Sequence, residues 1–450
     1  MEWRMAPPGM AEAAGRVIEG LLAHGREAYF VGGCIRDELL SRPVHDIDLT
    51  TAALPEEVIS IFPRTVPTGL AHGTVTVLED GFSFEVTTYR TESGYADHRR
   101  PEHVLFVSDV KEDLRRRDFT INAICCGSDG VLVDPFGGEK DLERKLVRCV
   151  GKAEERFDED ALRMLRCVRF ASVLDFSIAK NTWRGLLRQR DKLAHIAVER
   201  VRAELERIVE GPHPVRGLAL IARSGLLPRG KAPFPWTGSD LAAAAAMVSG
   251  IGELQSARLR WALLLHALGA SAREADELLR AWTFPGAARS SAAGVLRVRE
   301  AWTAALGEVP PGSPGGTEAL RRRWIAAVLA LGTEAAGGWL TVLEAVPQAG
   351  TAGAGAAGAA VGEPLSPPDE PAVAAQPSTA LLRSWTAEMP VYTLGELALT
   401  GGELSAALQK RPGPWIGARL QQLLQAVASG DLANDRQQLL QEAQRMDNNE

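Results

Sequence analysis

The chain has 450 residues, with 50 Lys and Arg against 57 Asp and Glu, a formal net charge of −7, and 46% hydrophobic residues. This composition excludes a fibrous or wholly disordered chain and leaves room for about two to four domains. The net charge excludes a global basic field that would attract nucleic acid or membrane, so a polyanionic partner must bind a local basic surface.

The five cysteines predict the redox environment. All of them lie in the first 170 residues, and none has the CxxC spacing of a zinc site. We therefore expect reduced thiols in a cytoplasm rather than a disulfide framework.

No segment is expected to enter a membrane. The N-terminal segment has two prolines and acidic residues within its apolar stretch, unlike a secretory signal. The longest uncharged run, 345–362, has five glycines, a proline and few large apolar side chains, which predicts a flexible linker. A cytoplasmic protein is the expectation.

The first 150 residues alternate short extended segments with short helices. The predicted elements are helices at 10–24, 34–40 and 56–62, strands at 28–33 and 46–50, and two strands within 73–90 that an Asp-Gly turn joins. This pattern predicts an α+β fold with a small mixed sheet for residues 1–150.

From about Gly151 the hydrophobic pattern has a period of 3.6, with no convincing strand. We expect all-α domains: a neck at 151–210, a body at 211–345 and a tail at 379–450, with an Ala/Gly/Pro-rich linker at 346–378. Segment 144–210 contains 16 Lys and Arg and 11 Asp and Glu. Its net of +5 leaves −12 for the rest of the chain, so the charge is segregated by region.

A glycine pair and an arginine follow the first predicted buried strand. Gly32 and Gly33 stand at the turn into a helix, and Arg36 lies one turn further. Backbone N–H groups at such a turn can approach a phosphate closely, and a helix N-terminus favours negative charge. For the glycine pair alone, a tight turn without a ligand is the alternative.

Two aspartates follow in HDIDLT. The spacing of Asp46 and Asp48 on a predicted strand places both carboxylates on one face, with Ile47 and Leu49 turned to the core. Like charges so close favour a divalent cation, and hard oxygen ligands favour Mg²⁺. Glu85, on a neighbouring predicted strand, is a candidate third ligand. An exposed polar strand face is the alternative for all three acids.

Five motifs in order resemble those of class II tRNA nucleotidyltransferases, a group of the polymerase-β-like superfamily that includes bacterial CCA-adding enzymes and poly(A) polymerases. The motifs are GGCIRD at 32–37, DID at 46–48, RRRDFTINAI at 115–124, DPFGG at 134–138 and EDALRMLRCVRF at 159–170. The resemblance covers about residues 1–230 and resumes weakly near the C-terminus. It implies a polymerase-β-like nucleotidyltransferase head followed by helical neck, body and tail domains.

The resemblance also implies roles for individual residues. Asp46 and Asp48 would be catalytic and bind two Mg²⁺ ions, one activating the tRNA 3′ hydroxyl and one holding the triphosphate. The implied nucleotide-binding residues are Gly33, Arg36, Arg117, Asp160, Arg163, Arg166 and Arg169. Asp118 is expected to orient Arg117 or cap a helix, and Arg115 and Arg116 are expected to be solvated.

Asp160 and Arg163 stand at i and i+3 on a predicted helix, where they can pair with one another. Cytosine and adenine both offer an amino donor beside a ring-nitrogen acceptor, which a carboxylate and a guanidinium can match. Uracil and guanine would leave these groups unpaired, at a cost of roughly 1 to 3 kcal/mol each. One pair can thus select C and A without a template. An ordinary surface pair is the alternative for an isolated D-x-x-R.

The predicted function is template-independent addition of the 3′-terminal CCA to tRNA from CTP and ATP, with release of pyrophosphate. Addition of only CC or only A is the alternative in the same class, and segment 91–107, which looks full length, favours complete addition. Bacterial poly(A) polymerases carry a G-[RK]-[RK]-F signature where this chain has TGLAHGTVTV at 68–77, which argues against that activity. The aspartate pair disfavours a noncatalytic RNA-binding protein, and Asp160 with Arg163 disfavours nucleotidyl transfer to a small molecule.

The expected partners are tRNA, ATP and CTP. The sequence leaves the oligomeric state open, and a homodimer is one of the alternatives. The local basic surface is expected in the neck, through Arg184, Arg188, Arg190, Lys192, Arg200 and Arg202. The resemblance implies that the tail grips the distal part of the tRNA. In LLLHALG, Ala267 stands where an HD-type phosphohydrolase has a metal-binding aspartate, so His266 is expected to be a core histidine.

Overall fold

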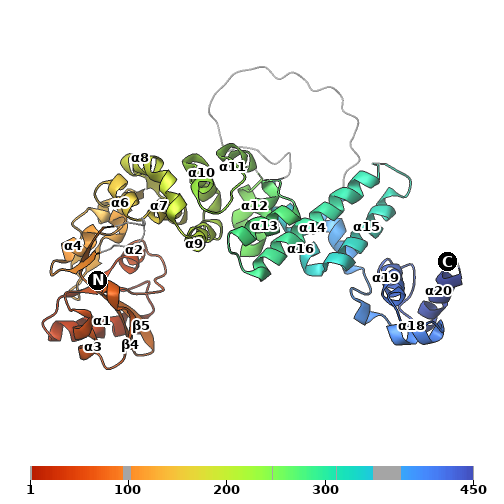
Figure 1. Cartoon of the computed structure of the whole chain (residues 1–450), viewed down its shortest axis with the longest axis horizontal. Coiled ribbons are helices and arrows are strands. Elements are labelled where there is room, and N and C mark those ends of the chain that lie inside the picture. Colours follow the sequence, from red (N-terminus) through yellow and green to blue (C-terminus); the bar gives the residue numbers. More distant parts are fainter. Residues whose placement is uncertain (1–2, 95–102, 246, 311, 348–376, 449–450) are drawn as a thin grey trace, which may run out of the picture. The chain divides into compact units, whose positions relative to one another are not determined.

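The computed structural model describes residues 3–94, 103–245, 247–310, 312–347 and 377–448 (Figure 1). The chain divides into two compact units, residues 1–242 and 243–450. Most of the predicted linker at 346–378 and the centre of segment 91–107 lie outside the described residues. Among the residues that are described, no helix is long and apolar enough to cross a membrane.

A seven-stranded mixed sheet organises the first part of unit 1, with the strand order β3-β4-β5-β2-β1-β8-β9. The two central strands β5 and β2 are parallel, with Val86 opposite Leu49, and the other neighbours are antiparallel. The strands are β1 (Ala28–Val31), β2 (Leu49–Thr51), β3 (Thr65–Gly69), β4 (Thr74–Glu79), β5 (Phe82–Thr88), β8 (Cys125–Cys126) and β9 (Leu132–Val133). The predicted α+β fold with a mixed sheet is confirmed.

Helix α1 (Pro8–Ala23) packs on the sheet through an apolar stripe of period 3.6. Val17, Ile18 and Leu21 in this stripe are fully buried, and each such side chain contributes about 1.5 to 3 kcal/mol through burial. Helix α3 (Pro55–Ile61) begins at a proline and packs against β4, β5 and α1. Both predicted helices are therefore confirmed.

The predicted Asp-Gly turn joins β4 to β5. Asp80 and Gly81 have φ angles of 47° and 83°, which two-residue hairpin loops favour because they match the strand twist. The two strands pair from Glu79 opposite Phe82 onward. This register places Phe84 and Val86 in the core and leaves Glu85 exposed.

The strand predicted at 46–50 is shorter than expected, because β2 begins only at Leu49. Its neighbour β1 ends at Val31, and Gly32 leaves the sheet with a φ of 83°. The Val31 N–H still donates to the Asp48 carbonyl at 3.0 Å, but the earlier residues have no partner on β1. The alternation holds nevertheless, since Ile47 and Leu49 are buried.

Two strands that were not predicted from the sequence form a separate antiparallel ribbon. They are β6 (Arg90–Ser93) and β7 (His103–Phe106), and Arg90 lies opposite Phe106. Helix α4 (Val110–Arg115) packs against β6. The residues that connect the two strands, 95–102, are outside the described part of the chain.

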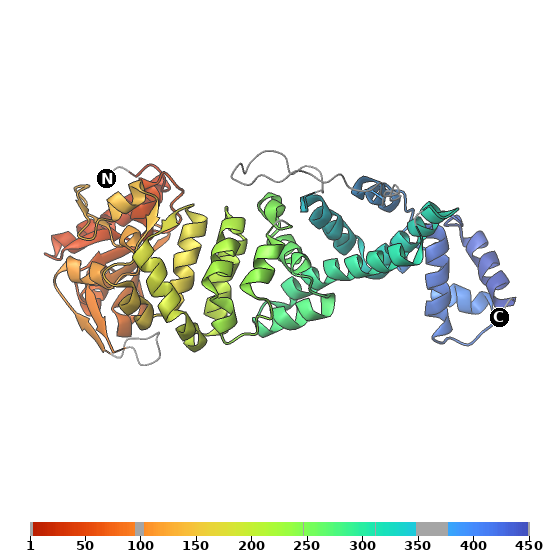
Figure 2. The ribbon, with the colours of Figure 1, turned by 90° about the horizontal axis from the view of Figure 1, so that it is seen from above.

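Helices make up most of the rest of unit 1, and the views agree that they occupy a separate part of the unit from the red and orange sheet (Figure 1, Figure 2). They are α6 (Ala153–Glu159), α7 (Leu162–Val173), α8 (Lys180–Gln189), α9 (Val198–Val209) and α10 (Pro214–Ser224). Because α10 packs on α7 and α9, the predicted neck–body boundary at 210/211 falls inside unit 1. A parallel pair of two-residue strands, β10 (Leu146–Val147) and β11 (Ser177–Ile178), was not predicted.

Unit 2 is helical. Its long helix α14 (Gly286–Glu308) packs against α12 (Ala257–Ala267), α13 (Ala272–Ala281), α15 (Gly316–Leu331) and α16 (Thr333–Ala345). Helix α17 (Thr379–Ala387) packs on α15 and α16. The first helix of the predicted tail therefore belongs to the same compact unit as the body. The remaining tail helices are α18 (Gly401–Ala407), α19 (Trp415–Ala428) and α20 (Arg436–Asn448).

His266 lies in α12 and packs edge-on against the ring of Trp339, with ring centroids 5.0 Å apart. Its Nδ1 is 3.4 Å from Nη1 of Arg299. Burial, and then the Arg299 charge, lowers the pKa of His266 to about 4. These contacts support the predicted core role of a neutral histidine.

Candidate active site

The turn after β1 requires glycine at Gly32. Its φ of 83° is in the left-handed region, and a Cβ there would lie 2.8 Å from Nη1 of Arg117. Gly33, the residue predicted to bind nucleotide, begins α2 (Gly33–Leu39), and a Cβ on it would meet only Arg36, at 3.7 Å. The close approach of backbone to a site residue is therefore at Gly32, whereas the sequence-based assignment had named Gly33.

Asp48 lies near two other carboxylates, Asp46 and Glu85, where β2 and β5 are side by side. Asp48 is half-buried just before β2, and the parallel register of Leu49 with Val86 places Glu85 beside it on β5. Burial, then the charge of Asp46, raises the pKa of Asp48 to about 6; Arg117 opposes the shift and Glu85 adds to it. The charges of Asp46 and Glu85 therefore act on Asp48, as expected if these three acids lie near one another.

The donor chemistry of this group fits a hard divalent cation. Among the described residues no three His, Cys, Asp or Glu side chains converge closely enough to hold a metal by themselves. Mg²⁺ usually keeps several waters and binds through one or two carboxylates plus substrate phosphates. Asp46 and Asp48, whose mutual repulsion a cation would relieve, suit that kind of site.

Arg36 is fixed from two sides. Its Nε and Nη2 donate to the two carboxylate oxygens of Asp37, at 3.0 and 2.6 Å, and its Nη1 donates to Oδ1 of Asn122 at 2.6 Å. The guanidinium also lies 5.0 Å from the ring centroid of Phe170 on α7. Arg36 therefore joins α2 to the RRRDFTINAI segment and to the neck.

Asp118 holds Arg166 rather than Arg117. Its Oδ2 accepts from Nε of Arg166 at 2.8 Å and lies 2.7 Å from Nη2 of the same guanidinium, and its Oδ1 accepts from Nδ2 of Asn122 at 3.1 Å. Burial alone would raise the pKa of Asp118, but Arg166 and then Asn122 outweigh it and lower that pKa to about 2. The predicted role of orienting Arg117 is wrong, because Arg117 turns toward another acid.

Arg169 is held by a buried glutamate that the sequence analysis did not single out. Its Nε donates to Glu204 on α9 at 2.5 Å. The guanidinium groups of Arg36, Arg166 and Arg169 lie 5.0, 5.4 and 4.0 Å from the ring centroid of Phe170. Three predicted nucleotide-binding arginines therefore surround one aromatic ring. Phe170 lies in the same EDALRMLRCVRF motif as Arg166 and Arg169. Its spacing from these two arginines was the signal in the sequence that could have identified it.

Asp160 and Arg163 do not lie on one helix. Asp160 is extended, with φ −136° and ψ 104°, between α6 and α7. It accepts from Arg200 at 3.0 Å, whereas Nη1 of Arg163 donates to Glu159 at 2.6 Å. The predicted pairing is thus replaced by two other ion pairs. The cause is local, since Oδ1 of Asp160 accepts from the Leu162 N–H at 3.0 Å and starts a new helix there.

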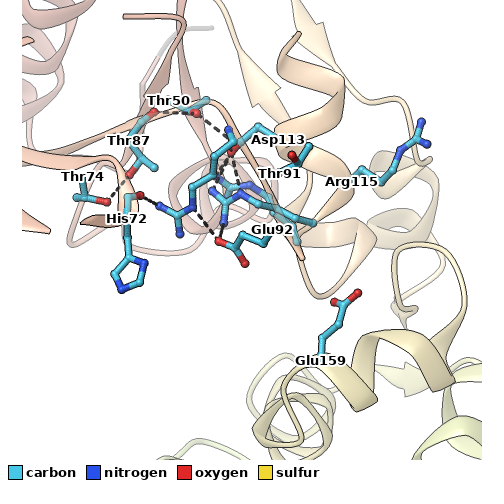
Figure 3. A network of polar contacts seen from close by, with 12 residues as sticks. Thr50, His72, Thr74, Thr87, Thr91, Glu92, Asp113, Arg115 and Glu159 are labelled. Atoms are coloured by element: carbon cyan, nitrogen blue, oxygen red, sulfur yellow. Dashed lines mark hydrogen bonds and ion pairs between the residues drawn. The ribbon is translucent and has the colours of Figure 1, made fainter. Parts of the chain in front are cut away.

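The prediction that Arg116 is solvated is wrong. It is 17% exposed, and its guanidinium contacts Asp113 at 2.8 Å and Glu92 at 3.2 Å (Figure 3). Arg115, by contrast, is 64% exposed and 3.4 Å from Glu112, which agrees with the prediction. The three successive arginines of RRRDFT therefore have different surroundings.

Arg117 is turned toward Asp113 and lies near Asp48. Its Nη2 lies 3.6 Å from Oδ2 of Asp113, and its charge favours the ionised form of Asp48. Its Nε is buried without a hydrogen-bond partner among the described residues. A buried donor left unpaired is costly, so Nε of Arg117 is a candidate for a contact with a ligand.

The predicted basic surface of the neck is largely neutralised by local acids. Ion pairs join Arg188 to Glu154, Lys192 to Asp158, Arg200 to Asp160 and Arg202 to Glu206. Arg190 donates to the Ser224 carbonyl at 3.5 Å, and Arg184 is exposed. These four acids lie within segment 144–210 and are already counted in its net charge of +5, so the excess positive charge comes from the other basic residues of the segment.

Three family models match the chain. The model described as "Poly A polymerase head domain" matches residues 28–148, and the one described as "Probable RNA and SrmB- binding site of polymerase A" matches residues 175–229. The model described as "tRNA nucleotidyltransferase domain 2 putative" matches residues 372–443. Both units of the structure therefore contain matched segments.

Individual relatives match almost the whole chain. The CCA-adding enzyme of Geobacillus thermodenitrificans is 39% identical over 438 residues, which cover 97% of this chain and 96% of the relative. The CCA-adding enzyme of Lactiplantibacillus plantarum is 38% identical over 96% of both chains.

Solved structures agree with this similarity. The crystal structure of the Bacillus stearothermophilus CCA-adding enzyme in complex with CTP matches with a TM-score of 0.77 at 36% identity, over 98% of both chains. The Thermotoga maritima CCA-adding enzyme complexed with tRNA, at 20% identity and a TM-score of 0.65 over 98% of this chain and 97% of that one, shows a shared fold.

Proposed function

The chain belongs to the bacterial CCA-adding enzymes, and from that membership we propose how its own residues add CCA to the 3′ end of tRNA. The activity is that of a CCA tRNA nucleotidyltransferase, which binds RNA and CTP. The observation that carries the residue assignment is the grouping of Asp46, Asp48 and Arg117 at the Gly32 turn. Two carboxylates that can bind a metal ion and an arginine that can bind phosphate suit the transfer of a nucleotide from its triphosphate.

Asp46 and Asp48 are the proposed metal ligands, and Mg²⁺ is the ion that their oxygen donors favour. When bound, Mg²⁺ ions would activate the attacking 3′ hydroxyl and stabilise the departing pyrophosphate. Asp48, with its pKa raised to about 6, would lose its fraction of bound proton when a cation neutralises the site. Glu85 is proposed to add to the negative field from the neighbouring strand.

Arg117 and Arg36 are the proposed partners of the incoming nucleotide on the side of the head. The unpaired Nε of Arg117 beside Gly32 supports a contact with a phosphate or sugar oxygen. Arg36 is already bound to Asp37 and Asn122. We propose that these bonds hold the Arg36 guanidinium in a fixed orientation, so less side-chain freedom is lost when the nucleotide binds.

Asp160, Arg163, Arg166 and Arg169 are the proposed nucleotide-binding residues of the neck. Asp160 and Arg163 would read the base edge, but each is oriented by a different partner, Arg200 and Glu159. An ionised carboxylate has two oxygens that can each accept more than one bond. Asp160 can therefore keep Arg200 and also accept from the amino group that cytosine and adenine share.

CTP and ATP are the proposed nucleotides, and tRNA is the proposed acceptor. The match of residues 175–229 to an RNA-binding model supports a contact with RNA through the neck, and the match of 372–443 supports a role of the tail in the same enzyme. A cytoplasmic site of action fits this substrate and the five buried cysteine side chains, all of which are free.

Competition among labelled CTP, ATP, UTP and GTP tests the proposed base reading. On tRNA that ends before CCA, cytidine should enter, and on tRNA ending in CC, adenosine should enter. Uridine and guanosine should enter at least about tenfold more slowly, because each would leave reader groups unpaired. Equal use of all four nucleotides would contradict the base-reading proposal.

A further inference from the structure

Asp113, on α4, is a fully buried carboxylate that no motif assigned to a role. Its Oδ1 accepts from Nε of Arg116 at 2.9 Å and from the backbone N–H of Arg90 at 3.3 Å. Its Oδ2 accepts from Oγ1 of Thr50 at 3.3 Å and lies 3.6 Å from Nη2 of Arg117. Figure 3 labels Asp113 and Thr50, which lie close together.

The partners of Asp113 come from several elements of unit 1. Thr50 is in β2, two residues after Asp48, and Arg90 begins the β6–β7 ribbon. A fully buried carboxylate needs such partners, because removing one side of a buried pair leaves the other charge uncompensated. Asp113 therefore has a defined position relative to β2.

Arg117 depends on Asp113 for its placement. Among the described residues, Asp113 is the acid within ion-pair distance of Arg117. On its other side the Arg117 guanidinium lies against Gly32, where even a Cβ would be only 2.8 Å from Nη1. The arginine is thus held between a carboxylate and the turn, with its buried Nε unpaired.

We propose that Asp113 is a positioning residue for nucleotide addition. It acts through Arg117, whose guanidinium it holds against the Gly32 turn, where that guanidinium meets the nucleoside triphosphate. Without the carboxylate, the long side chain of Arg117 would have to be ordered by the nucleotide itself, which lowers affinity. The proposal rests on the proposed function and names a residue that the substrate need not touch.

Exchange of Asp113 for Asn in the full chain keeps the size of the side chain and removes its charge. The KM for CTP and ATP, and the Kd for CTP measured without tRNA, should both rise about tenfold, while kcat changes by less than about threefold. Arg117→Ala should raise the same constants. The double variant should be no worse than Arg117→Ala alone, because the two residues act as one unit.

Asp141→Asn is the matched control. Asp141 is also buried and charged, and it accepts from Oγ1 of Thr120 at 2.7 Å and Nε of Arg148 at 3.0 Å. The Asp141→Asn substitution should lower the thermal midpoint by about as much as Asp113→Asn does, and it should leave the Kd for CTP unchanged. A loss of nucleotide affinity that accompanied both variants equally would show a structural effect only and would overturn the proposal.

The double-variant comparison gives the decisive outcomes. An unchanged Kd in Asp113→Asn, or additive effects of the two substitutions, would overturn the proposal. If Asp113→Asn does not fold, Arg117→Lys keeps the charge beside Asp113 but lacks the fork that reaches both partners, so its Kd should rise about tenfold; an unchanged Kd would overturn the proposal too. A wild-type chain that adds nothing to tRNA would count against the proposed function, whereas an active wild type with additive variants would count against Asp113 alone.

Discussion

Nε of Arg166 donates to Oδ2 of Asp118 at 2.8 Å, and Nη2 of the same guanidinium lies 2.7 Å from that oxygen, across 48 residues of chain. Asp118 belongs to the RRRDFT segment and Arg166 to α7. Asn122 donates to the same carboxylate and accepts from Arg36. The two proposed nucleotide-binding arginines Arg36 and Arg166 are therefore fixed relative to each other through a single short network.

Acid should weaken this network only at low pH. The pKa of Asp118 is about 2 in the folded chain against an ordinary value of 3.8, so the folded state favours the ionised form. Its contribution, on the order of 2 kcal/mol, is present above the unfolded pKa and is lost as pH falls through the folded pKa. Thermal midpoints between pH 5 and pH 2 should fall less steeply in Asp118→Asn than in the wild type, and parallel curves would contradict the pairing.

Asp48→Ala should reduce nucleotide incorporation by about a thousandfold or more, because it removes a proposed metal ligand. Affinity for tRNA should be unchanged, since this substitution touches none of the neck or tail. Rates of incorporation and tRNA binding measured on the same preparation check both points. Asp129→Ala, which alters an exposed aspartate of a turn in the same unit, is the control and should retain full activity.

Glu85→Gln tests whether the third carboxylate supports the metal site. The concentration of Mg²⁺ that gives half-maximal rate should rise severalfold, and the rate at saturating Mg²⁺ should recover. Glu79→Gln, on the neighbouring strand β4, should leave the Mg²⁺ dependence as it is. If Glu85→Gln behaves like Glu79→Gln, Glu85 is an exposed strand residue without a part in the site.

Arg200→Ala should relax base selection. Arg200 orients Asp160 at 3.0 Å, and a carboxylate without that partner is less well placed to accept from a base amino group. The preference for CTP over UTP should fall about tenfold, within the cost of an unpaired buried group. Arg202→Ala changes a residue on the same helix that pairs with Glu206, and it should keep the preference. Equal preferences in both variants would refute the role of Arg200.

The lowered pKa of His266 predicts that the stability of unit 2 depends on pH, because the histidine is partly buried in its neutral form. Its pKa is about 4 in the folded chain against 6.5 ordinarily, so between these values the unfolded state binds more protons and stability rises with pH. After allowance for partial exposure, the effect is about 1 to 2 kcal/mol. The thermal midpoint should fall from pH 7 to pH 4.5, and less so in His266→Gln. An equal fall in both proteins would contradict it.

Local periodicity was enough to predict part of the candidate site. Alternation of period 2 placed Ile47 and Leu49 in the core although the strand itself begins later. The three-residue spacing of Arg163, Arg166 and Arg169 placed these arginines on one helix, α7. Both patterns depend on residues a few positions apart, which a sequence shows directly.

Partners distant in the sequence could not be predicted in this way. Glu204 holds Arg169 across 35 residues, and Asp113 collects groups from β2 and β6. No spacing marks the pair of Glu204 and Arg169, whereas Asp113 does stand four residues before Arg117, a spacing that favours an ion pair on a helix. The break before α7 did have a local signal, because an aspartate often caps a helix, but the EDALRMLR pattern was continuous enough to favour one helix through Asp160.

CCA addition by this chain is tested most directly by sequencing the products formed on tRNA. Transcripts that end before CCA, after the first C and after CC should be incubated with the pure chain, CTP, ATP and Mg²⁺. We predict that all three acquire ends that read CCA and stop there. Failure to extend any of them would contradict the account, and products that stop at CC, or extension only of the transcript ending in CC, would show a partial activity instead.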